Sequence, residues 1–141
     1  MSSKLLTNPL TGTLTFGTVP AVVLDGAALP EAHIFLAEGR HIGPNRGFGA
    51  RHIWLEHRRE MLAVGLMREA DVPLFVLRII RTGTPLIYEG SSWRVTRLMA
   101  VRAASGTAVL EYREQRQGAI WAIVTAYSGT KTHGTRVGTV R

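Results

Sequence analysis

The spacing of hydrophobic residues changes near residue 84, and this change most constrains what the chain can fold into. Residues 48–67 contain no proline, and their apolar side chains recur at helical spacing: Phe48, Leu55, Leu62 and Leu66. Residues 69–83 predict a second helix, because they open with acidic residues and a proline and close with Arg81 and a glycine. Two helices are therefore expected before residue 84.

After residue 84 the runs are typical of strands. Four of them, separated by Gly-Ser, Ser-Gly and Gln-Gly breaks, cover residues 84–90, 92–103, 106–115 and 118–128. Their short connections predict an antiparallel meander of four strands. Within 92–103, alternation sets Trp93 opposite Arg94 and Arg102, which predicts one largely basic face.

The expected fold class is α+β, with N-terminal helices packed on a four-stranded or slightly larger antiparallel sheet. The first third is turn-rich and contains weak strand candidates at residues 11–19 and 32–41. We divide the chain into a turn-rich segment, 1–38, which either joins the same fold or serves delivery or docking, and a domain, 39–141, that carries the candidate functional residues described below. The tail from residue 129 repeats Gly-Thr beside basic residues, which fits a phosphate-contacting strand or loop and equally a frayed terminus.

The amino-acid composition excludes several classes of protein and of functional site. A chain of 141 residues with 45% hydrophobic residues can bury a core without cross-links. The absence of cysteine excludes disulfides, thiolate zinc sites and a cysteine nucleophile. No apolar run approaches the length of a membrane span, and the first residues lack the apolar centre of a signal peptide.

The charge points to a nucleic acid. The formal net charge is +7, and arginine supplies nearly all of the basic side chains. Positive charge gathers in residues 39–68 and 94–141, whereas residues 1–38 and 69–93 are slightly acidic. Because arginine matches phosphate oxygens, this distribution favours a phosphate-binding surface over an evenly solvated one.

The stretch GFGARHIWLEH, residues 47–57, holds two histidines at the opening of the first predicted helix. Zinc hydrolases place paired histidines four apart on one helix face, whereas His52 and His57 are five apart. No aspartate or cysteine cluster offers a third ligand. We therefore expect no metal and no other cofactor.

General acid–base chemistry is the preferred interpretation of these histidines. RNA carries its own nucleophile, the 2′-hydroxyl, so cleavage needs only a base, an acid and cations beside the phosphate. His52, next to Arg51, is the leading candidate. The structural alternative is a core histidine, and it is strongest for His57, which lies beside Trp54 and Met61.

The last predicted strand supplies the other half of the expected site. Thr125 and Tyr127 are two residues apart, so their hydroxyls point to the same face of a strand, near Lys131. We expect the imidazole of His52 and these two hydroxyls to border one positively charged groove.

These two motifs resemble a known group of proteins. The stretch GFGARHIWLEH is similar to the G-F-G-x-x-H-I-x-x-x-H signature of phage- and toxin-associated nucleases, the Barnase–EndoU–colicin–RelE-like group. VTAYS is similar to the Thr-x-Tyr or Thr-x-Phe element on a late strand of that group. The resemblance spans residues 40–131, and the order of helices and sheet agrees with it.

The resemblance implies metal-independent cleavage of RNA, often transfer RNA, to a 2′,3′-cyclic phosphate. It makes His52, His57, Thr125 and Tyr127 the catalytic residues. No lysine follows the histidines on the helix, so phosphate binding would fall to other residues: Arg40, His41, Arg51, Arg59 and Lys131. The assignment of the acid stays open, with His41 as a further candidate.

The group also implies an immunity or antitoxin partner, and action on RNA in the cytoplasm after delivery from a phage or a secretion system. No membrane partner is expected. Two other functions compete with the ribonuclease: a non-catalytic basic protein that binds RNA or DNA, and a phage structural or assembly protein. Base stacking on exposed aromatics would favour the binding protein, but the chain has few aromatic residues to offer.

Overall fold

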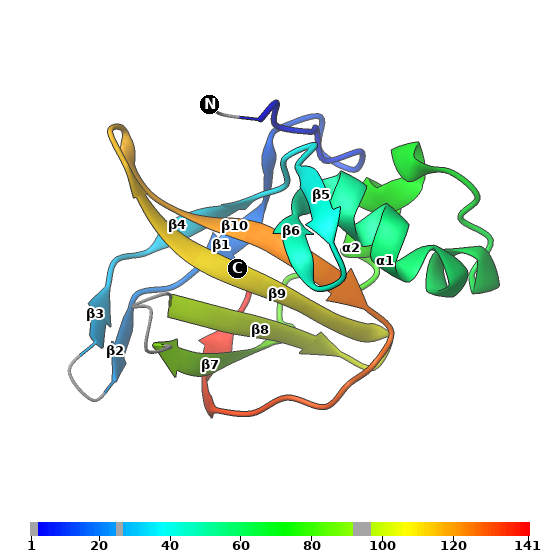
Figure 1. Cartoon of the computed structure of the whole chain (residues 1–141). Helices are drawn as coiled ribbons and strands as arrows, with labels where there is room; N and C mark the ends of the chain where they lie inside the picture. The colour runs from blue at the N-terminus through cyan, green and yellow to red at the C-terminus, as the bar shows by residue number, and fades with distance from the viewer. Residues whose placement is uncertain (1–2, 25–26, 92–96) are drawn as a thin grey trace.

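The computed structural model describes residues 3–24, 27–91 and 97–141 (Figure 1). Its elements in chain order are β1 (Thr15–Val19), β2 (Val22–Leu24), β3 (Ala27–Leu29), β4 (Ala32–Phe35), β5 (Arg40–Gly43), β6 (Arg46–Phe48), α1 (Gly49–Ala63), the 3-10 turn η1 (Glu69–Asp71), α2 (Val72–Leu77), β7 (Pro85–Ser91), β8 (Arg97–Ala103), β9 (Gly106–Gln115), β10 (Gly118–Tyr127) and β11 (Thr135–Thr139). The predictions for Trp93 and Arg94 lie outside the described residues.

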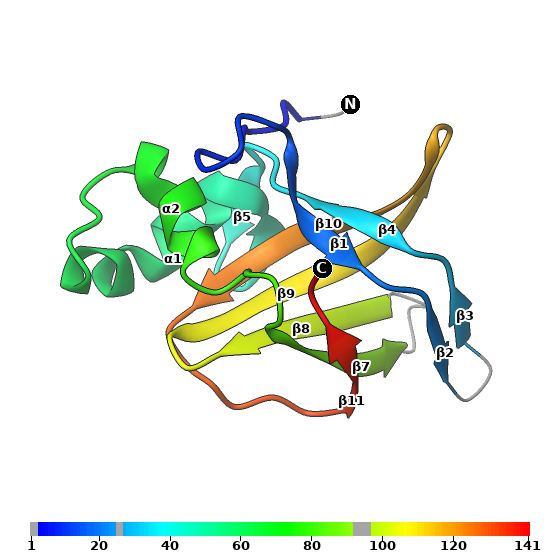
Figure 2. The same cartoon turned by 180° about the vertical axis from the view of Figure 1, so that it is seen from behind.

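The main sheet has seven strands in the order β1-β4-β10-β9-β8-β7-β11, and it curls into a half-barrel (Figures 1 and 2). The consecutive strands β7, β8, β9 and β10 pair antiparallel, which confirms the predicted meander. Strand β4 runs parallel to β10, so the complete sheet is mixed. Two separate hairpins, β2–β3 and β5–β6, project from it.

The α+β class is confirmed, but the predicted position of the helices is wrong. Helices α1 and α2 are central in the chain and follow six short strands. The main sheet has seven strands, where four or slightly more were predicted, and it is not purely antiparallel. The weak strand candidates at residues 11–19 and 32–41 contain β1 and β4, but no local pattern reports that these strands pair with each other and with β10, far away in the chain.

The second helix is shorter than the range 69–83 predicts. Its first turn is the 3-10 turn η1, and regular helix continues only through Val72–Leu77. Ile79 and Ile80 are buried as the chain turns towards β7, and Gly83 has a φ of 92°. The two isoleucines are therefore buried outside the helix, which local spacing does not report.

The two chain ends are joined to the same sheet. Residues 1–38 contribute β1 and β4, and the tail forms β11 along β7. Backbone hydrogen bonds of 2.8 and 2.9 Å link Thr18 and Arg141, and Val140 is buried. These bonds join the two outer edges of the half-barrel, and Figure 2 shows the C-terminus beside β1.

The hydrophobic core fills the inside of the curled sheet. Its largest fully buried side chains include Trp121 and Ile123 of β10, Ile34 of β4, and Ile53 and Met61 of α1. Helix α1 thus packs its apolar side on the sheet beside the end of β10 (Figure 1). Within the described ranges, no helix has the length and apolar character to cross a bilayer.

Candidate active site

The Gly-Phe-Gly segment lets the β5–β6 hairpin fold closely against the start of α1. Gly47 has a φ of 146° and Gly49 a φ of 80°, a region that side-chain-bearing residues rarely adopt. A Cβ at Gly47 would lie 2.3 Å from the Arg40 carbonyl oxygen and 2.7 Å from Nδ1 of His52. Glycine at position 47 therefore leaves the space that the His52 ring occupies.

His41 of this hairpin meets His52 of the helix. Their Nδ1 atoms are 3.1 Å apart, and their rings stack with centroids 5.3 Å apart. His52 is only 4% exposed, whereas His41 is half-buried. Glu56 lies one helical turn after His52, and ligand atoms of all three side chains lie within 4.8 Å of one another.

The environment of His52 disfavours its charged form. Burial lowers the pKa of His52, and the charges of His41 and His57 lower it further, against the raising effect of Glu56. His52 is therefore neutral at pH 7. Since the two Nδ1 atoms are in contact, one of them donates the proton of a hydrogen bond and the other accepts it.

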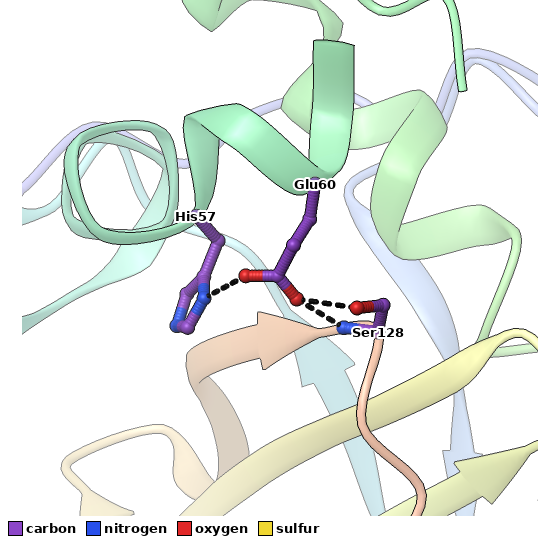
Figure 3. Close-up of polar contacts among 3 residues, drawn as sticks. All are labelled: His57, Glu60 and Ser128. Carbon is purple, nitrogen blue, oxygen red and sulfur yellow. Dashed lines mark hydrogen bonds and ion pairs between the residues drawn. The ribbon is translucent and has the colours of Figure 1, made fainter. Parts of the chain in front are cut away.

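A second group of polar side chains surrounds His57 (Figure 3). Nδ1 of His57 lies 2.5 Å from Oε2 of Glu60, and the side chains are 23% and 29% exposed. The other carboxylate oxygen, Oε1, accepts hydrogen bonds from the backbone N–H and the hydroxyl of Ser128, at 2.6 and 2.7 Å. The helix is kinked at His57, whose backbone φ and ψ angles are not helical.

Glu60 determines which ring nitrogen of His57 carries the proton. Burial alone would raise the pKa of Glu60, but the hydrogen bonds from Ser128 and from His57 outweigh it and lower that pKa. Glu60 is therefore a carboxylate at neutral pH, which only accepts hydrogen bonds. Nδ1 of His57 must carry the donated proton, and Nε2 of a neutral ring is left as the basic atom.

Tyr127 lies beside His57 at the end of β10. Their ring centroids are 5.6 Å apart with the planes tilted by 36°. Burial raises the pKa of Tyr127, and Glu89 adds to the rise. The phenol consequently keeps its proton at neutral pH and is available as a donor.

Thr125 shares a face of the sheet with Tyr127. Strand β10 contains a bulge between Ile123 and Thr125, after which Thr125 pairs with Val109 and Tyr127 with Thr107. The Thr125 hydroxyl is buried and has no hydrogen-bond partner in the described part of the protein. Thr125 and Tyr127 are two residues apart, so they face the same side, opposite the buried Ala126. The bulge puts them on the other face from Ile123, because Ile123 pairs with Leu110 and Thr125 with the next residue of β9, Val109.

The structure sorts the predicted catalytic residues into two groups. Glu56, His41 and His52 form one group, under the hairpin. His57 and Tyr127 form the other, joined by residues that the sequence analysis missed, Glu60 and Ser128. The single groove expected to unite His52 with Thr125 and Tyr127 stays a prediction, since the ring contact of Tyr127 among the described residues is with His57.

The predicted phosphate-binding side chains other than His41 are exposed. Arg40 lies on β5, Arg59 on α1 and Lys131 beyond the end of β10. Arg51 is 3.1 Å from Glu69 in an ion pair that is open to solvent. Such a pair is weak, so Arg51 can exchange this partner for a phosphate.

A cavity of about 510 Å³ lies on the same sheet face as the two hydroxyl-bearing residues. It is lined by Ile120 and Ala122 of β10, and by Phe48, over whose ring the Arg113 guanidinium lies at 5.2 Å. Ile120 and Ala122 pair with Arg113 and Glu111 of β9, and Thr125 and Tyr127 pair with Val109 and Thr107. These four partners are alternate residues of β9, so all of these side chains lie on one face of the sheet. A larger cavity, of about 720 Å³ between β1, α2 and the C-terminus, is lined by none of the predicted site residues.

Two of the missed residues had a signal in the sequence. Glu56 follows His52 by four positions and Glu60 follows His57 by three, so each carboxylate lies on the helix face of its histidine. Ser128 had no such signal, because its contact with Glu60 joins residues 68 positions apart.

Comparison with known proteins gives no family for this chain: no family model, no curated protein and no solved structure matches it. The resemblance to Barnase–EndoU–colicin–RelE-like nucleases therefore stays a prediction. The geometry around His57 is the strongest basis for proposing a function.

Proposed function

We propose that this protein is an endoribonuclease that cleaves RNA without a metal ion, with His57 as the general base. The observation that carries the proposal is the contact of His57 with Glu60. Two hydrogen bonds from Ser128, directly after β10, hold the Glu60 carboxylate in place. A carboxylate that orients a partly exposed imidazole is a recurring arrangement for proton transfer.

The proposed reaction follows from the proton positions. Nε2 of His57 accepts the proton of the RNA 2′-hydroxyl, and the 2′-oxygen attacks the adjacent phosphorus. The bond from phosphorus to the 5′-oxygen breaks, and that oxygen takes a proton from the phenol of Tyr127. The products are a 2′,3′-cyclic phosphate and a 5′-hydroxyl. The reaction needs these two residues and neither a cysteine nor a cofactor.

The surrounding charge supports RNA as the substrate. Arg59 and Lys131 are exposed near the ends of the two elements that carry His57 and Tyr127. The cavity beside Phe48 and Arg113 offers an aromatic ring and a guanidinium, the groups on which nucleobases stack. We assign phosphate contacts to the two cations and a nucleobase to this cavity.

The proposal includes the architecture of the Barnase–EndoU–colicin–RelE-like group. In this chain, as in that group, a helix with the histidines precedes an antiparallel meander that ends in Thr-x-Tyr. His52, the leading candidate from the sequence, becomes a supporting residue in the proposal because its ring is buried. An immunity or antitoxin partner is proposed from the resemblance alone.

The test is RNA cleavage in the presence of EDTA. The purified protein is incubated with total RNA, and the fragment ends are identified as cyclic phosphates and 5′-hydroxyls. His57→Gln is expected to lower the rate by about 10²–10⁴-fold, the usual contribution of a general base. His133→Gln, an exposed histidine outside the site, is the matched control and should keep the wild-type rate.

Two results would contradict the proposal. Loss of cleavage on chelation would point to metal-dependent chemistry. RNA that is bound in a salt-sensitive manner and stays intact would instead support the non-catalytic nucleic-acid-binding protein.

A further inference from the structure

The group formed by His41, His52 and Glu56 is separate from the His57 site and has no part in the proposed proton transfers. Its members come from two elements, since His41 lies on β5 while His52 and Glu56 lie one turn apart on α1. Their ligand atoms lie within 4.8 Å of one another. The set of two imidazoles and one carboxylate is that of many three-ligand zinc sites.

The spacing of the two nitrogens fits a shared metal ion. Zinc–nitrogen bonds of 2.0–2.1 Å in a tetrahedral site place two ligand nitrogens about 3.4 Å apart. The Nδ1 atoms of His41 and His52 are 3.1 Å apart, so a shift of a few tenths of an ångström brings them to this spacing. The contact joins the Nδ1 atom of one ring to the Nδ1 atom of the other.

The backbone around the cluster keeps this space open. Any side chain at Gly47 would place a Cβ 2.7 Å from Nδ1 of His52, so only glycine leaves that nitrogen accessible. The backbone N–H of Asn45, in the turn between β5 and β6, donates a hydrogen bond to Glu56. Such a contact from outside the ligand set orients a carboxylate for a metal.

We propose that His41, His52 and Glu56 bind one Zn²⁺ ion, with water as the fourth ligand on the half-exposed side of His41. The ion joins the β5–β6 hairpin to the first turns of α1. Nitrogen ligands with one carboxylate suit zinc and its neighbours among the first-row metals, whereas magnesium and calcium prefer oxygen alone. The inference is independent of the proposed function, because the metal is detected without RNA.

The experiment is a titration of the metal-free protein with Zn²⁺ by calorimetry, and with Co²⁺ by visible absorption. We expect one ion per chain, a tetrahedral Co²⁺ spectrum and a higher melting temperature with Zn²⁺. His41→Ala and Glu56→Gln are expected to weaken binding by at least about 100-fold and 10-fold. Both residues have side chains at or near the surface, and circular dichroism checks that the variants fold.

The control is His133→Ala, which removes an exposed histidine outside the cluster and should leave the zinc affinity unchanged. His57→Gln removes the histidine next to Glu56 and should weaken binding far less than His41→Ala does. The inference is overturned if His57→Gln weakens binding as much as His41→Ala does, because the ion would then sit at the His57–Glu60 pair. It is also overturned if the wild-type protein binds zinc no more tightly than His41→Ala. Because EDTA would also remove this zinc ion, RNA cleavage is measured for His41→Ala as well: cleavage by a variant that binds no zinc separates the fate of the zinc site from that of the proposed His57 chemistry.

Discussion

Glu60 connects the kinked helix α1 to the end of β10 by accepting two hydrogen bonds from Ser128, at 2.6 and 2.7 Å. The same carboxylate holds Nδ1 of His57 at 2.5 Å. One side chain therefore fixes both the orientation of the imidazole and its distance from Tyr127, whose ring lies 5.6 Å away. Hydrogen bonds to a charged group contribute about 1.5–3 kcal/mol each, so this connection also stabilises the fold.

Replacing Glu60 tests its role as a positioning residue. Glu60→Gln keeps the shape but removes the charge, so the proton on His57 is no longer confined to Nδ1. We expect the RNA cleavage rate to fall about 10–100-fold with little change in KM. Glu114→Gln, an exposed residue of β9, is the control and should behave as the wild type.

The same carboxylate predicts a dependence of stability on pH. The pKa of Glu60 is lowered from its usual value of about 4.5, so its stabilising effect is complete above that pH and is lost as pH falls through the lowered pKa. Urea unfolding at a series of pH values should show the wild type and Glu60→Gln converging in this acidic range. A constant difference between the two would contradict the lowered pKa.

His52 predicts a second pH effect at higher pH. Its pKa is lowered from 6.5, so below that value the unfolded chain binds a proton that the native protein does not. The free energy of unfolding should therefore decline as pH falls below 6.5 and level off below the lowered pKa. This decline should be smaller in His52→Asn, while His133→Asn should retain it. Equal slopes in all three proteins would show that the ring is not held neutral.

Tyr127 is expected to donate the proton to the leaving group. Tyr127→Phe removes the phenol hydroxyl and keeps the ring beside His57, so cleavage should slow by about 10²-fold or more while the melting temperature changes little. Because the pKa of Tyr127 is raised above 10, the wild-type rate should not fall on the alkaline side before that pH. Tyr112→Phe, at an edge-on contact with Trp121, is the control for losing a phenol elsewhere. An unchanged rate in Tyr127→Phe would assign the acid to another residue.

Two glycines of one hairpin give a matched pair for stability. Gly47→Ala puts a Cβ 2.3 Å from the Arg40 carbonyl oxygen at a φ of 146°, and we expect a loss of about 1–3 kcal/mol or more. Gly43→Ala meets nothing within 4 Å and should change the free energy of unfolding by less than about 1 kcal/mol. Urea unfolding of both variants measures the difference, and similar losses would mean that the hairpin is not packed closely on His52.

Part of the fold was predictable because its signals are local. The meander of β7 to β10 follows from alternating runs separated by short turns. The helix predicted over residues 48–67 is present as α1, but its predicted apolar face is wrong: Leu55 and Leu62 are exposed, and Ile53 and Met61 are buried instead. The pairing of β4 with β10 joins residues about 87 positions apart, such as His33 and Ile120, and no local pattern reports it. The helix predicted over residues 69–83 is too long, because regular helix ends at Leu77 and Ile79 and Ile80 are buried in the core beyond its end.

The candidate site divides in a similar way. The sequence by itself determined the candidates: two histidines on one helix, and Thr125 and Tyr127 on a late strand. The carboxylates Glu56 and Glu60 were also within reach of a sequence argument, since they follow His52 and His57 by four and three positions, but they were not among the predicted residues. Only the tertiary structure decided their partners, bringing His41 to His52 and Ser128 to Glu60. The physical reason is that residue type and periodicity act over a few positions of the chain, whereas the β5–β6 hairpin and the β10 bulge set side-chain contacts through packing between distant segments.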